Sequence, residues 1–136
     1  MQKTNHYLPY ALLLVSAGLL GWGVLGLIEY AFPEVGFGLQ NDAFPNGLQF
    51  LHFLSILITG FIFVFGFWRR WPPTPYATIT MYAVLATLCF IETVDFGAFG
   101  GGTKGIMIMA MEFVLYFVLA TYLLRSSSIK KHFDPL

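Results

Sequence analysis

Ionisable side chains occur in or near long apolar stretches of this chain, where such groups are rare. Four carboxylic acids and one histidine are placed in this way: Glu29, His52, Glu92, Asp95 and Glu112. A charged side chain inside hydrocarbon is costly, so several acids at one depth ask for a functional explanation. Carboxylates and an imidazole can bind a cation, pair with one another, or exchange protons with a ligand.

Glu112 is the most informative of these residues because it lies well inside the last apolar stretch. It is about eight residues from the start of that stretch, or roughly 12 Å along a helix. Tyr116 follows at i+4, which is within reach for a hydrogen bond. An acid at this depth should face the interior of a helix bundle and be paired. We therefore predict that Glu112 and Tyr116 belong to a ligand- or proton-binding site.

The second apolar stretch carries polar residues along one helical face. Asn46, Gln49 and His52 recur at a spacing of three residues, which places them on the same side of a helix. Gln49 and His52 are therefore predicted to face the same site. The alternative for His52 is a packing residue that is satisfied by one hydrogen bond.

Two further acids, Glu92 and Asp95, are one turn apart in the third stretch. Such a pair can hold a cation, share a proton, or repel until one acid is protonated. Asp95 could instead be solvated at the interface or paired with Lys104. Glu29, near the end of the first stretch, could likewise be interfacial and solvated.

One residue from each of four helices could meet in a bundle core: Glu29, His52, Glu92 and Glu112. Carboxylate and histidine ligands on facing helices are the ingredients of a metal site. A divalent metal is therefore a candidate cofactor, although the Glu-x-x-His spacing of di-iron bundles is absent. The same groups could act as proton donor and acceptor on a lipid-soluble substrate.

The elements that must position these residues are membrane-spanning helices. The chain has 136 residues, is 57% hydrophobic and only 10% charged, and has a mean hydropathy of +0.73. A soluble domain of this length could not bury so much apolar surface. The predicted spans, each close to the ~20 residues that a bilayer requires, are residues 8–30, 47–68, 76–96 and 104–124. Each must be helical, because the bilayer core offers no water to the backbone.

With Lys104 as the exception, six of the seven basic residues lie on one side of these spans: Lys3, Arg69, Arg70, Arg125, Lys130 and Lys131. The positive-inside rule then places both termini in the cytoplasm. We predict an all-α, integral membrane four-helix bundle with up-down-up-down topology, formed by residues 1–136 as a single domain. A bacterial inner membrane fits this arrangement, and it would place the acids and His52 in the outer half of the bilayer.

The expected partners follow from the same composition. A net charge of zero suggests no nucleic-acid partner, and the single Cys89 excludes an internal disulfide. We expect contacts with the lipid bilayer, with further copies of the chain or a larger membrane complex, and with a hydrophobic small molecule.

The layout resembles the DoxX-like group of small four-span membrane proteins. Tyr30 and Pro33 close the first span, and the acidic segment Met111-Glu112-Phe113 lies early in the fourth. This resemblance implies an accessory or redox-associated membrane subunit, and it carries over only Glu112 as a shared acid.

Three functions remain open at this point. The chain could be a non-enzymatic membrane subunit that binds a ligand or cation. It could be an isomerase, a cyclase or a quinone-linked enzyme acting on a lipid-soluble substrate. As an oligomer, it could also be a proton- or cation-coupled transporter. Whether the chain is catalytic is left undecided by its residues.

Overall fold

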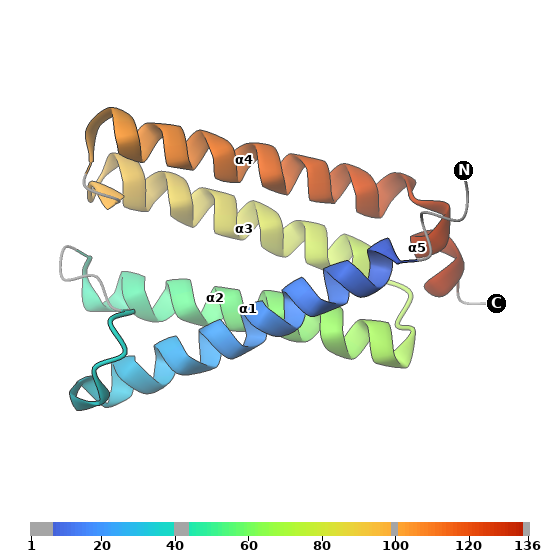
Figure 1. Cartoon of the computed structure of the whole chain (residues 1–136), viewed down its shortest axis with the longest axis horizontal. Helices are drawn as coiled ribbons and strands as arrows, with labels where there is room; N and C mark the ends of the chain where they lie inside the picture. Colours follow the sequence, from blue (N-terminus) through green and yellow to red (C-terminus); the bar gives the residue numbers. More distant parts are fainter. Residues whose placement is uncertain (1–6, 40–43, 99–100, 135–136) are drawn as a thin grey trace.

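The described residues form an all-helical arrangement in a computed structural model (Figure 1). The structure describes residues 7–39, 44–98 and 101–134, so Lys3 lies outside it. No strand occurs in these ranges, which confirms the all-α prediction. The elements are α1 (Leu8–Ala31), η2 (Pro33–Val35), α2 (Asn46–Arg69), α3 (Thr74–Val94), α4 (Gly102–Arg125) and α5 (Ser127–His132).

Helices α1 to α4 are each long and apolar enough to cross a membrane. They match the predicted spans to within about two residues at each end. Each begins at the end of the molecule where the preceding helix finishes (Figure 1). Large apolar side chains cover their outer faces, with Leu14 and Phe117 each 74% exposed. Such surface suits contact with lipid better than contact with water.

Glycines bring α1 and α2 into close contact. A Cβ atom at Gly23 would lie 2.6 Å from the backbone N of Leu57. A Cβ atom at Gly60 would lie 2.5 Å from the carbonyl oxygen of Ser16. No larger residue fits at either position, so small residues set the distance between these helices, as is common inside membranes.

The turn between α2 and α3 is enforced by its sequence. Arg70 adopts a left-handed conformation with φ of 52°, and the Trp71 N–H donates back to the Gly66 carbonyl oxygen at 2.9 Å. This is the Schellman pattern of a helix end. Pro72 and Pro73 follow, and because proline has no N–H the helix cannot continue.

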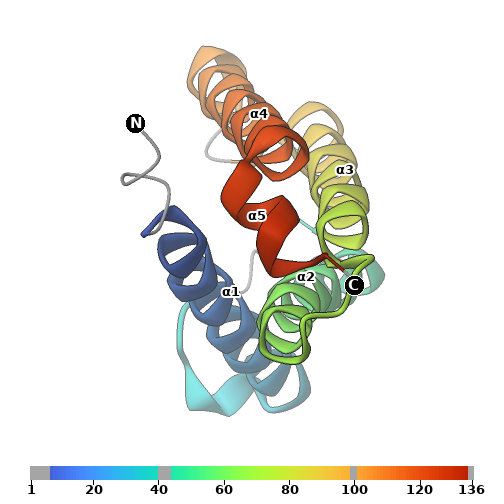
Figure 2. The same cartoon turned by 90° about the vertical axis from the view of Figure 1, so that its right-hand side faces the viewer.

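Helix α5 closes the basic end of the bundle and was not predicted from the sequence. Its Ile129 is fully buried and Phe133, just after it, is 4% exposed. Both belong to a core cluster that includes Phe63 and Leu123. Figure 2 shows α5 lying across the end of the four long helices. The core is therefore densely packed at this end, and open space lies further along the bundle.

Candidate ligand-binding cavity

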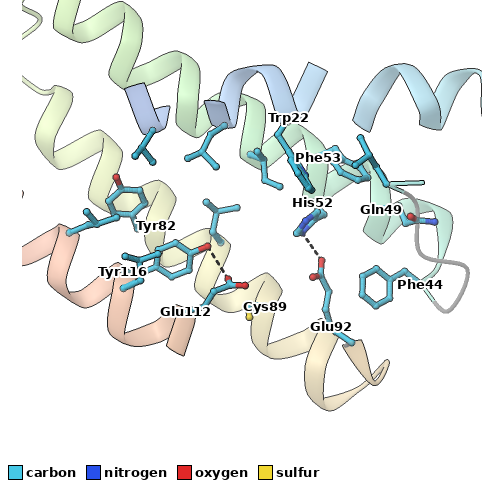
Figure 3. A pocket seen from close by; sticks show the side chains of 18 residues that line it. Trp22, Phe44, Gln49, His52, Phe53, Tyr82, Cys89, Glu92, Glu112 and Tyr116 are labelled. Carbon is cyan, nitrogen blue, oxygen red and sulfur yellow. Dashed lines mark hydrogen bonds and ion pairs between the residues drawn. The ribbon is translucent and has the colours of Figure 1, made fainter. Parts of the chain in front are cut away.

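A cavity of about 470 Å³ lies between the long helices, beyond the packed basic end. Its volume falls within the usual range for small-molecule sites, about 300–1,000 Å³. Each helix contributes a stripe of side chains at helical spacing (Figure 3). From α1 to α4, the stripes consist of Val15, Leu19 and Trp22; Gln49, His52, Phe53 and Ile56; Tyr82, Leu85, Cys89 and Glu92; and Glu112, Leu115, Tyr116 and Leu119.

The first polar pair in this cavity joins α2 to α3. Nδ1 of His52 lies 2.7 Å from Oε2 of Glu92, and the two side chains point toward one another in Figure 3. Neither atom has another hydrogen-bond partner among the described residues. Glu92 is only 6% exposed, so each group depends on the other to satisfy its polar atoms. The sequence predicted both residues as site residues, but it did not predict that they would pair.

The second polar pair lies within α4. The Tyr116 hydroxyl donates to Oε2 of Glu112 at 3.0 Å, which confirms the predicted i+4 hydrogen bond. Tyr82 of α3 stacks on Tyr116, with ring centroids 5.6 Å apart. Cys89 lies beside the Glu112 carboxylate in Figure 3. Tyr82 therefore packs on the tyrosine that holds Glu112, and Glu112 itself lines the cavity, so this acid faces the interior as predicted.

Glu29 does not join these groups. It is buried, at 4% exposed, but it is not one of the residues that line the cavity. Its Oε2 accepts a hydrogen bond from the Gly38 N–H at 2.7 Å, and its Oε1 accepts one from the Leu39 N–H at 2.8 Å. The chain reverses here because Gly36 and Gly38 have positive φ values, which glycine adopts without strain. Glu29 therefore anchors the segment that follows α1.

The loop that Glu29 holds contributes a cover to the cavity. Leu39 and Phe44 both line it, and the Phe44 ring meets the Phe96 ring edge-on at 6.2 Å. The backbone hydrogen bond at Leu39 thus connects the Glu29 carboxylate directly to one wall of the cavity.

Of the two remaining predicted residues, Gln49 lines the cavity and Asp95 does not. Gln49 is buried and lines the cavity, as predicted. Asp95 is exposed and does not line it. Asp95 and Lys104 are both described by the structure, and they do not form the ion pair that the sequence suggested as an alternative. Asp95 follows the last residue of α3, so its side chain lies at the rim.

The predicted four-ligand metal set is not assembled. Within the described residues, no three His, Cys, Asp or Glu side chains are grouped so that they could hold a metal ion. Glu29 is engaged by the segment that follows α1, while Glu112 bonds to Tyr116. Only His52 and Glu92 meet. Two ligands fall short of the three or four protein ligands of a usual metal site.

The cavity reaches the molecular surface between α1 and α4. Helix α1 packs against α2, and α4 packs against α3, while α1 and α4 lie apart in Figure 2. Val15, Trp22 and Leu115 line the cavity and are also 55%, 51% and 53% exposed. These side chains form the edges of an opening on the apolar outer face of the bundle.

Tyr82 and Leu85 are cavity residues that the sequence analysis did not identify. They lie on the same face of α3 as Cys89 and Glu92, at offsets of three, four and three residues. Extending the helical period from Glu92 toward the start of the span would have found them. Trp22 lies seven residues before Glu29 and so shares its helical face, but Glu29 does not line the cavity, so this spacing could not have identified Trp22 as a cavity residue.

The resemblance to DoxX-like proteins stays a prediction, because no protein-family model, curated protein or solved structure matches this chain.

Proposed function

We propose that this chain is a multi-pass membrane protein that binds a lipid-soluble small molecule in the cavity. The observation that carries the proposal is an apolar cavity that holds two hydrogen-bonded polar pairs and opens on the lipid-facing surface. Predominantly apolar pockets with a few convergent polar groups are typical of small-molecule sites. The ligand would have an apolar body and a head group that carries oxygen atoms.

The topology proposed for the chain is up-down-up-down, with both termini cytoplasmic, in a bacterial inner membrane. Five basic residues support this orientation, because they end α2 and α4, follow α2 directly or belong to α5: Arg69, Arg125, Arg70, Lys130 and Lys131. In this orientation the cavity faces the outer half of the bilayer. The resemblance to DoxX-like proteins adds support for a role as an accessory subunit, alone or with further copies of the chain.

The polar pairs favour a particular head group. When Glu92 is ionised and His52 is neutral, Nδ1–H donates to the carboxylate, and Nε2 is left as an acceptor. A ligand hydroxyl could then donate to Nε2. On the other side of the cavity, the Tyr116 hydroxyl donates to Glu112 and its oxygen can still accept a hydrogen bond. A ring that carries hydroxyl or carbonyl groups would satisfy both sides.

Tryptophan fluorescence offers a direct test, because Trp22 lines the cavity. The other two tryptophans, Trp68 and Trp71, lie in the last turn of α2 and just after it, and neither lines the cavity. A Trp68→Phe/Trp71→Phe variant leaves Trp22 as the sole reporter, and a Trp22→Phe variant is the matched control. The probe is a short-chain benzoquinone, added to full-length protein in nanodiscs. We expect saturable quenching of Trp22 and only linear, partition-driven quenching in the control. Linear quenching of both reporters would refute binding in the cavity.

A second pair of variants ties the signal to the cavity. Leu119→Phe adds volume to the cavity wall, whereas Val118→Phe adds even more volume to a side chain that is 54% exposed and does not line the cavity. Overpacking a filled site typically costs about 1–3 kcal/mol, which corresponds to roughly 5- to 150-fold in affinity. We expect Leu119→Phe to weaken the affinity measured from Trp22 quenching by this factor, and Val118→Phe to leave that affinity unchanged.

An enzymatic role is the second candidate, and the His52–Glu92 pair favours it. A carboxylate that orients an imidazole is a common arrangement for general acid–base catalysis. A proton-transferring enzyme exchanges substrate protons with solvent. Membranes that contain the protein, incubated in D₂O with lipid extract, should then incorporate deuterium into one lipid-soluble compound. His52→Gln should abolish this incorporation, and equal incorporation in both membranes would exclude the enzymatic role.

A further inference from the structure

A second, smaller pocket lies at the opposite end of the molecule, away from the cavity. It has a volume of about 230 Å³ and joins the start of α1, the end of α2 and α5. We call it the basic pocket, and its lining residues are Pro9, Tyr10, Phe67, Arg70, Ser128, Lys131 and His132. These residues combine apolar surface with two cationic side chains, an imidazole and two hydroxyl groups.

The floor of the basic pocket is held in place by His132. Its Nε2 lies 2.8 Å from the Phe67 carbonyl oxygen, so an N–H at this nitrogen donates to the end of α2. The imidazole also stacks on the Phe67 ring, with centroids 4.0 Å apart and planes inclined by 18°. These contacts fix α5 against α2, so that Lys131 of α5 and Arg70 at the end of α2 line the same pocket.

The positive charges of the basic pocket have no acidic partner among residues 7–39, 44–98 and 101–134. Neither Arg70 nor Lys131 forms an ion pair with a carboxylate there, and both side chains are exposed. Two cations at one pocket repel each other unless an anion is present. Arg70 presents a planar set of donors that matches phosphate oxygens, and the Ser128 hydroxyl can donate one more hydrogen bond.

The surroundings place the basic pocket at the level of lipid head groups. Trp68 and Tyr76 flank it in sequence and are 85% and 66% exposed, as is typical of the aromatic belt at a membrane interface. Arg69 and Lys130 add further positive charge beside the pocket. Basic pockets at this level between helices of membrane proteins bind anionic head groups.

We propose that the basic pocket binds the phosphate of an anionic phospholipid. Arg70 and Lys131 would contact the phosphate oxygens, and Ser128 would donate a hydrogen bond. Pro9, Tyr10 and Phe67 would pack against the glycerol and the first part of the acyl chains. The lipid would connect α1 and α2 to α5, which holds the core closed at this end.

The chain provides matched controls for this proposal. Arg70→Gln/Lys131→Gln removes two charges from the basic pocket, while Arg69→Gln/Lys130→Gln removes two charges from the adjacent positions outside it. Both variants have the same net charge and the same attraction to an anionic surface. Native mass spectrometry of full-length protein from mixed phosphatidylglycerol and phosphatidylcholine vesicles measures which lipid is retained.

We expect wild type and the Arg69/Lys130 variant to retain phosphatidylglycerol over phosphatidylcholine by roughly 30-fold, from two basic contacts. The Arg70/Lys131 variant should fall to within about twofold. Equal loss in both double variants would attribute retention to general surface charge and overturn the proposal. Displacement of the lipid by millimolar inorganic phosphate would overturn it as well, because the site would then bind the free anion.

Two single variants keep the test decisive if the Arg70/Lys131 variant does not elute as a monodisperse species. Lys131→Gln and Lys130→Gln can be compared in the same experiment. A drop of about threefold or more in phosphatidylglycerol retention for Lys131→Gln alone supports the proposal, and equal retention overturns it. Neither result bears on quenching of Trp22, so the basic pocket and the cavity are tested independently.

Discussion

Glu29 offers the sharpest test of how the segment after α1 is held in place. Its two carboxylate oxygens accept hydrogen bonds from the backbone N–H groups of Gly38 and Leu39, at 2.7 and 2.8 Å. Glu29→Gln keeps the size of the side chain, but only one of its two terminal atoms can accept a hydrogen bond. One backbone N–H then faces an NH₂ group and loses its acceptor.

The cost of this loss can be worked out from the burial of Glu29, which is 4% exposed. Leaving a buried donor unsatisfied costs about 1–3 kcal/mol. Because each 1.4 kcal/mol is a factor of about ten, the loop should open roughly 5 to 150 times more often. Native-state hydrogen exchange reports such local opening directly. The amides of Gly38 and Leu39 should exchange faster by this factor in Glu29→Gln.

Glu34→Gln is the matched control, because it removes the same charge from the same loop. Glu34 lies in η2 and its side chain is exposed. Exchange at Gly38 and Leu39 should be unchanged in this variant. If the Glu29 variant exchanges no faster than the Glu34 variant, the carboxylate does not hold the loop and Glu29 regains its place as a candidate ligand-binding residue.

Three further variants test the packing and the polar pair, each measured as unfolding in mild detergent. Gly23→Leu should destabilise the protein by about 1–3 kcal/mol or more through overpacking, because its Cβ would meet Leu57. Gly21→Leu is the control and should be tolerated, because this position faces open space. His52→Leu should cost about 1–3 kcal/mol by leaving Glu92 unsatisfied, and adding Glu92→Leu should restore most of that loss. Ile129→Ala should cost about 2–5 kcal/mol and expose α5 to protease, since this side chain is fully buried; an unchanged rate of cleavage would contradict the role of α5 in closing the core.

The helices could be predicted from the sequence because a bilayer leaves few alternatives. A long apolar stretch must be helical there, and the basic residues mark one end of the bundle. Helix α5 has only six residues, and the buried residues in it and just after it, Ile129 and Phe133, are four apart. Two apolar residues at that spacing do not distinguish a docked helix from a loop, so this element could not be predicted.

The site was predicted in part, and the division has a physical cause. His52, Glu92, Glu112 and Tyr116 lie within helices, where the period fixes which residues share a face. The fate of Glu29 depends on the loop after α1, where the left-handed conformations of Gly36 and Gly38 turn N–H groups toward the carboxylate. Loop conformation of this kind leaves no periodic trace, so an anchoring acid and a ligand-binding acid look the same in the sequence.

The arrangement of the two polar pairs restricts the ligand more than the cavity volume does. His52 and Glu92 hold the α2 and α3 walls together, and Glu112 and Tyr116 lie on α4. In the proposed function, a polar head between them would satisfy groups on both sides, and the apolar part of the ligand would lie along the α1 and α4 stripes toward the opening. The packed core around Phe63 and Leu123, with α5 behind it, blocks the way to the basic end. In the proposed function, a ligand longer than the cavity must therefore leave its tail in the lipid. Long-chain and short-chain quinones should then quench Trp22 with similar affinity. A second polar group at the end of the tail should be tolerated only if the tail is long enough for that group to reach the membrane interface.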